Sequence, residues 1–235
     1  MRRCWWVVIV AAIVAVAGCA TGTTASSSGS PVPTATPVPS GPAATESEQA
    51  GESREVHGFT KVELVSFGDL QIDQTGTESL TIEAAPDVLP KLTSGVSGGI
   101  LRLRLAPGTT IRNAGPVVYH LTVAALDSIA VAGAGAVTAS NLQTDRLAVD
   151  ISGAGHVTLA GAVDSQTVTI TGTGNYDGEN LQSATADVTV DGAAKAVVRV
   201  STRLNATVEG VGSVQYIGNP QVTRKVNGVG SVKPR

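Results

Sequence analysis

The chain has 235 residues, of which 42% are hydrophobic, 15% are charged and only 3% are aromatic, and its formal net charge at pH 7 is −3. Proteins that bind nucleic acids use basic surfaces for the phosphates and aromatic rings for the bases, so this composition argues against a nucleic-acid partner. The length suits one or two domains.

Residues 1–18 have the features of a secretion signal. Arg2 and Arg3 form a basic start, and residues 5–17 are apolar, which is long enough for a signal peptide but too short to span a bilayer. The boundary Val16-Ala17-Gly18-Cys19 resembles the lipobox of bacterial lipoproteins. This resemblance implies a lipoprotein signal peptide over 1–18 and acylation of Cys19, including palmitate, which would anchor the protein in a membrane outside the cytoplasm. The alternative is an ordinary secreted protein in which Cys19 has no role.

Residues 19–55 are expected to form the lipidated cysteine and a disordered tether. Of residues 20–55, 28 are Ser, Thr, Pro, Gly or Ala, and only Val32 and Val38 are larger aliphatics. Such a segment buries too little apolar surface to offset the entropy of its chain. Its Ser and Thr residues beside Pro are also candidates for O-glycosylation.

The segment 56–235 is expected to fold as one domain, and most of it has a repeat of 18–20 residues. Each copy carries a Gly-x-Gly pair, with a valine or isoleucine two positions before the first glycine and polar or small residues between the apolar ones. One copy departs from the pattern and reads Gly192-Ala193-Ala194. The paired glycines, which we expect to be structural, are Gly133, Gly135, Gly153, Gly155, Gly172, Gly174, Gly210, Gly212, Gly228 and Gly230.

This pattern predicts stacked strands. Alternation of apolar and polar residues indicates strands with one buried face, and units this short must stack on copies of themselves. The glycines mark positions where no side chain fits or where φ is positive. We therefore predict an all-β parallel β-helix or β-solenoid of about seven turns, with Val131, Val190 and Val226 in one interior column.

A weaker copy of the repeat precedes the clean ones at residues 62–72, with Ser66 in place of the first glycine. Strands are expected at 80–84, 100–105 and 117–123, a helical turn within 86–93, and a loop over 107–116. Open ends of a stack need protection from further pairing. We expect this N-terminal part to cover one end, and Lys233, Pro234 and Arg235 to protect the other.

Three segments carry a family resemblance: residues 58–64 (GFTKVEL), 126–135 (LDSIAVAGAG) and the close over 214–220 (VQYIGNP) with 226–232 (VNGVGSV). They resemble the GIN-domain family, described as an auto-transporter adhesin head. The resemblance covers about 56–235 and implies a β-helix-like fold and a role in adhesion. It supplies no catalytic or binding residues.

The outward column before the first glycines gives the sharpest candidate site. Asp191 and Glu209 are expected to be neighbours on adjacent turns, with Asn227 beyond them. Two carboxylates about 5 Å apart could hold a cation or act as a glycosidase pair, but such a column is also typical of a solvated ladder. A second outward column, Thr169, Thr189 and Thr207, predicts a hydroxyl ladder on the solenoid face.

No cofactor is expected, because no Gly-x-Gly pair continues into a nucleotide-binding motif and the three histidines are scattered. The leading hypothesis is a non-enzymatic, lipid-anchored envelope protein, in the outer membrane if the host is Gram-negative, whose solenoid binds an envelope or surface polysaccharide or protein. The alternatives are a polysaccharide-acting enzyme that uses Asp191 and Glu209, and a purely structural spacer. The sequence does not define the oligomeric state.

Overall fold

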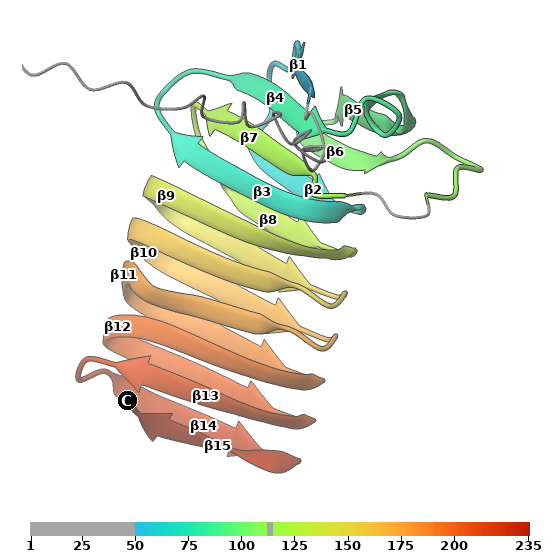
Figure 1. Cartoon of the computed structure of the whole chain (residues 1–235). Coiled ribbons are helices and arrows are strands. Elements are labelled where there is room, and N and C mark those ends of the chain that lie inside the picture. Colours follow the sequence, from blue (N-terminus) through green and yellow to red (C-terminus); the bar gives the residue numbers. More distant parts are fainter. Residues whose placement is uncertain (1–49, 112–114) are drawn as a thin grey trace, which may run out of the picture. The chain divides into compact units, whose positions relative to one another are not determined.

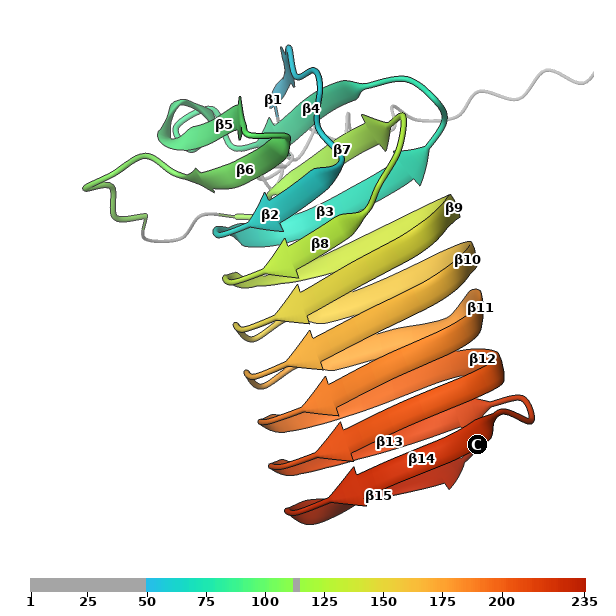
Figure 2. The ribbon, with the colours of Figure 1, turned by 180° about the vertical axis from the view of Figure 1, so that it is seen from behind.

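The computed structural model describes residues 50–111 and 115–235, and it confirms an all-β solenoid (Figure 1). Fifteen strands form one continuous sheet, which the chain winds into stacked coils. Figure 2 shows from behind that the coils have two walls, which face each other across the interior. Among the described residues, no helix is long and apolar enough to cross a membrane.

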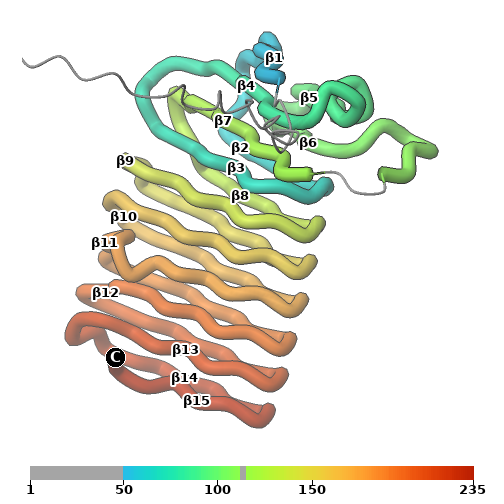
Figure 3. Tube along the Cα trace, in the orientation of Figure 1, coloured from blue at the N-terminus to red at the C-terminus, as the bar shows by residue number. Residues whose placement is uncertain are grey.

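Four long strands each form nearly a whole coil: β9 (Ala134–Ile151), β10 (His156–Ile170), β11 (Asn175–Val190) and β12 (Ala193–Val208). Each pairs in parallel with the next. The first half of β9 pairs with β3 (Phe67–Gln74) and its second half with β8 (Ser128–Val131), so one strand contributes to both walls. The path of the coils is clearest in the tube of Figure 3.

The solenoid has about five complete coils, and the prediction of seven turns was too high. The fifth coil consists of two strands, β13 (Val211–Ile217) and β14 (Gln221–Val226), which pair with the two halves of β12. β15 (Val229–Pro234) then adds only half a coil. The weak copy at 62–72 does not form a consecutive coil, because the chain leaves the stack after it and returns at β8.

The first glycine of each pair is required by close approach of neighbouring coils. A Cβ on Gly153 would lie 2.0 Å from the carbonyl oxygen of Gly133, and a Cβ on Gly172 would lie 2.1 Å from that of Gly153. None of the ten paired glycines has a positive φ, so the alternative of a left-handed backbone at these positions was wrong. At the atypical copy, β12 begins at Ala193, two positions earlier in the register than β10 and β11.

The interior column of β-branched residues is continuous, as predicted. Val131 and Val190 are fully buried. Val226 stands in register with Val208, which itself pairs with Val190, but it is 40% exposed. The difference arises because no described strand pairs with the outer edge of β14.

The N-terminal part forms a cap on the stack. β2 (Lys61–Leu64) and β3 lie directly on β8 and β9, although about 65 residues separate them in sequence. The intervening chain adds β6 (Ile100–Leu105) and β7 (Val118–Val123) in parallel to β2 and β3, and then β4 (Ser79–Ala84) and β5 (Leu92–Ser97) in antiparallel orientation. A short 3-10 helix, η1 (Leu89–Lys91), precedes β5.

The ordered domain begins earlier than predicted. β1 (Ala50–Arg54) lies within the segment expected to be tether, yet it pairs antiparallel with β4. Arg54 also donates hydrogen bonds to the carbonyl oxygens of Leu89 (3.4 Å) and Leu92 (3.3 Å). These backbone and side-chain bonds compensate for the low hydrophobicity of residues 50–54. The predicted signal peptide, Cys19 and the rest of the tether lie outside the described residues.

Candidate binding groove and outward columns

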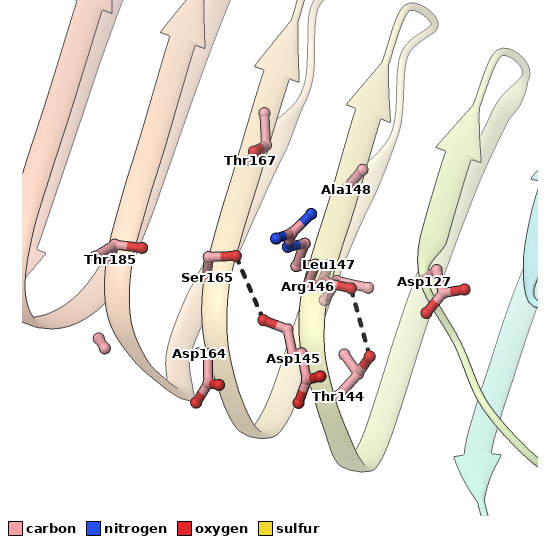
Figure 4. A pocket seen from close by; sticks show the side chains of 11 residues that line it. Asp127, Thr144, Asp145, Arg146, Leu147, Ala148, Asp164, Ser165, Thr167 and Thr185 are labelled. Atoms are coloured by element: carbon pink, nitrogen blue, oxygen red, sulfur yellow. Dashed lines mark hydrogen bonds between the residues drawn. The ribbon is translucent and has the colours of Figure 1, made fainter.

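A polar groove with a volume of about 1030 Å³ crosses the outer surface where the coils turn into their second wall (Figure 4). Three successive strands, β9, β10 and β11, contribute to it, together with the residue just before β8. We call this the coil groove. Its polar side chains are Asp127, Thr144, Asp145, Arg146, Asp164, Ser165, Thr167 and Thr185.

The repeat itself places the acids of the coil groove. Val163 pairs with Thr144 and Ser165 pairs with Arg146, so Asp145 and Asp164 occupy equivalent positions on neighbouring coils. Parallel strands lie about 4.8 Å apart, so the two carboxylates come close to each other. Both side chains are exposed, and Figure 4 shows them side by side at the bend.

Hydrogen bonds to the backbone hold some of the groove hydroxyls. Ser165 Oγ donates to the carbonyl oxygen of Asp145 at 3.3 Å, and Thr144 Oγ1 donates to that of Arg146 at 3.4 Å. The hydroxyl oxygens keep their acceptor capacity, and the exposed carboxylates can accept further bonds. The groove can therefore hydrogen-bond a ligand rich in hydroxyl groups, whereas its three carboxylates against one guanidinium disfavour an anion.

The predicted acidic column is present in register, but on an open corner. Asp191, Glu209 and Asn227 are all exposed and follow the paired residues Val190, Val208 and Val226. The backbone amides of Glu209 and Asn227 donate to the preceding coil at 2.8 and 2.9 Å. None of the three side chains lines the coil groove. Across residues 50–111 and 115–235, no three His, Cys, Asp or Glu side chains gather into a metal site.

The threonine column also lies in register. Thr169 pairs with Thr189, and Thr189 pairs with Thr207. All three are partly buried on the second wall. They form a regular hydroxyl-bearing strip on the same wall as Thr167, which lines the coil groove.

A buried polar network inside the coils was not predicted from the sequence. Tyr176 donates a hydrogen bond to Gln166 Oε1 at 2.7 Å, and Gln166 Nε2 donates to Ser183 Oγ at 2.8 Å. Burial raises the pKa of Tyr176 far above its ordinary value, and the nearby Asp177 carboxylate raises it further. The only sequence signal is that Tyr176 replaces a valine of the interior column and is followed on the next coil by the small Ala196.

Stacked parallel coils with a shared aliphatic interior and a polar outer groove define this domain as a two-walled β-solenoid. The chain belongs to the GIN-domain family, whose model, described as "Putative auto-transporter adhesin, head GIN domain", matches residues 58–220. The resemblance found in the sequence is thereby confirmed. Among curated proteins, no sequence matches the chain.

Solved structures share the fold. A protein from Bacteroides fragilis described as "a putative adhesin" is 22% identical, with a TM-score of 0.69 over 80% of this chain and 97% of its own. A "putative adhesin" from Parabacteroides distasonis is 16% identical, with a TM-score of 0.52 over 81% and 98%. A "Putative lipid binding protein" from the same species is 15% identical, with a TM-score of 0.50 over 81% and 98%.

Proposed function

We propose that the protein is a lipid-anchored envelope protein whose solenoid is a non-enzymatic adhesion head, and that the coil groove binds an uncharged, hydroxyl-rich polymer such as an envelope polysaccharide. Membership of an adhesin-head family supports adhesion. The observation that carries the choice of ligand is the groove itself, in which carboxylates and hydroxyls recur on successive coils. A ligand with its own repeat can contact several coils at once, so weak single contacts add up.

The groove is tested by binding of the full chain to immobilised neutral and anionic polysaccharides. The double variant Asp145→Asn with Asp164→Asn is expected to weaken binding to a neutral polysaccharide at least tenfold, because it removes two charged acceptors. Asp191→Asn is the matched control, since this exposed carboxylate lies outside the groove. Equal affinity of wild type and double variant would disprove the assignment.

The same assay also tests whether adhesion is non-enzymatic. The bound polysaccharide is expected to be recovered at its original chain length after prolonged incubation, since the groove lies open on the outer surface, whereas catalytic sites are usually enclosed. Shortening of the polymer that disappears in Asp191→Asn would instead support the enzyme hypothesis.

The anchor rests on the lipobox resemblance at residues 16–19. Two acyl chains on one residue would provide the second lipid that stable anchoring requires. Radiolabelled palmitate is expected to enter the wild-type protein and not Cys19→Ala. Equal labelling of both proteins would contradict the proposal.

A further inference from the structure

The two ends of the solenoid differ in the orientation and pairing of their last strands. At the cap, the outermost strands β1 and β5 run antiparallel to their partners β4 and β6, and each keeps one edge that no described strand pairs with. At the other end, shown beside the C-terminus in Figures 1 and 2, β14 pairs only with β12, and β15 pairs only with β13, within the described residues. Both strands therefore present one free edge. We call the outer edge and side chains of residues 221–235 the open coil.

Backbone groups of the open coil are available to another strand. The amides of Val229 and Arg235 donate to the preceding coil at 3.0 and 2.9 Å. Because alternate residues of a parallel ladder point to opposite sides, the amides of Gly230 and Val232 face outward. Pro234 occupies the next outward position and has no amide to offer. On β14, Asn227 donates inward at 2.9 Å, so the amide of Arg224 faces outward.

Apolar side chains accompany this free edge. Val229 is 77% exposed and Val226 is 40% exposed, although Val226 belongs to a column that is fully buried one coil earlier. An added strand would cover these valines and extend the interior by one level. The open coil thus offers free backbone groups for strand addition and exposed apolar side chains for the alternate residues of an added strand to cover.

The charge of the open coil selects the kind of strand. Residues 221–235 contain four basic side chains and no acidic one: Arg224, Lys225, Lys233 and Arg235. Arg235 is paired with Glu179, whereas the other three form no ion pair with a described residue. The basic character begins in the coil directly before it, because residues 192–220 contain Lys195, Arg199 and Arg203 against one acid, Glu209. Residues 115–191 have the opposite character, with eight acidic side chains and Arg146 as the one Lys or Arg.

We propose that the open coil is a docking site for an extended acidic segment of a partner protein, which adds as the next strand. A second copy that docked through its own open coil would bring two basic edges together, and such like-charge contact is a known protection against self-association. An acidic strand meets opposite charges and gains the same backbone hydrogen bonds. Apolar residues alternating with the acids would cover Val226 and Val229.

The probe is a blocked fluorescent nine-residue peptide in which glutamate alternates with valine, titrated into the full-length protein. Saturable binding is expected. Lys225→Glu with Lys233→Glu is expected to weaken it at least tenfold, whereas Lys61→Glu, an exposed lysine of the cap, leaves it unchanged. Equal weakening by the cap variant would overturn the site.

A second pair of variants separates strand addition from simple charge attraction. Arg224→Pro and Arg224→Ala remove the same charge, but only the proline removes the outward amide. Peptide affinity is expected to fall at least threefold further in Arg224→Pro, with both variants unfolding at similar denaturant concentrations. Equal affinities, or equally tight binding of a proline-interrupted peptide of the same charge, would overturn strand addition. Dimerisation of the wild type that Arg224→Pro abolishes would assign the edge to a second copy and also overturn the proposal.

Discussion

The cap and the coils both contribute strands to one continuous sheet, but the chain follows a different path in each. In the coils, each strand pairs with a neighbour fewer than 25 residues away in sequence, and every level repeats the one before. In the cap, β2 pairs with β8 and β3 pairs with β9, although these partners lie about 65 residues further along the chain. The cap also contains antiparallel pairs, such as β4 with β7. A stack can therefore be extended by repetition, but it can be closed only by a segment that departs from the repeat.

The largest expected effect comes from breaking a coil at its glycine corner. Gly153→Val places side-chain atoms where Gly133 O already lies, 2.0 Å from the new Cβ, and this oxygen belongs to the backbone. We expect a loss of more than about 4 kcal/mol of unfolding free energy, or no folded protein. The loss of unfolding free energy is measured by urea unfolding.

Gly95→Val is the control in the cap region. Gly95 lies on β5 with nothing within 4 Å of its Cβ position and without a positive φ. The free energy of unfolding of this variant is expected to differ from that of the wild type by no more than about 0.5 kcal/mol. A similar loss in both variants would mean that the corners are not set by close approach.

The second prediction compares the middle of the stack with its open end, using one interior column. Val190→Ala removes two buried methyl groups and leaves a cavity, for an expected cost of about 2–3 kcal/mol. Val226→Ala is expected to cost less than about 1 kcal/mol, because Val226 is 40% exposed. Equal costs in urea unfolding would indicate that something covers the open coil.

The third prediction concerns the buried network of Tyr176, Gln166 and Ser183 in the coils. Tyr176→Phe leaves Gln166 Oε1 without its donor in the interior, and we expect a cost of about 1–2 kcal/mol. Tyr216→Phe is the control, since Tyr216 is only partly buried. No difference between the two would show that the network contributes nothing to stability.

The same side chain predicts a pH dependence. Burial raises the pKa values of both Tyr176 and Tyr119 in the folded protein, so above about pH 10 the unfolded chain binds fewer protons than the folded one. Their contribution to stability is complete below that pH and is lost as the pH rises, by up to about 1.4 kcal/mol per pH unit for each tyrosine. The fall in unfolding free energy above pH 10 is expected to be shallower in Tyr176→Phe, and an identical slope would contradict it.

The smallest effect is expected at the first strand of the cap. Arg54→Ala removes hydrogen bonds to Leu89 and Leu92, which should cost about 1 kcal/mol and loosen β1 from β4. Hydrogen exchange of the amides in residues 50–54 is expected to accelerate, while those of β11 keep their protection. Unchanged exchange in β1 would show that its pairing with β4 alone is sufficient.

From the sequence, much of the candidate site could be predicted only as columns, that is, as residues at equivalent positions on successive coils. The register that aligns Thr169, Thr189 and Thr207 follows from repeat spacing alone, and the structure confirms it. The same spacing aligned Asp191 with Glu209 but could not tell that this column lies on an open corner. Asp145 and Asp164 were missed because they lie just beyond a bulge between Leu159 and Gly161, which shifts the register of β10 on β9 by one residue.

The amino-acid sequence by itself determined the solenoid, its interior valines and the crowded glycine corners, because alternation and period are local properties that every copy restates. Only the tertiary structure decided which strands form the cap, where the coil groove lies, how Tyr176 reaches Gln166, and that none of the described strands covers the last coil. These features depend on which distant segments meet, and contact between segments far apart in the chain leaves no periodic trace in either one.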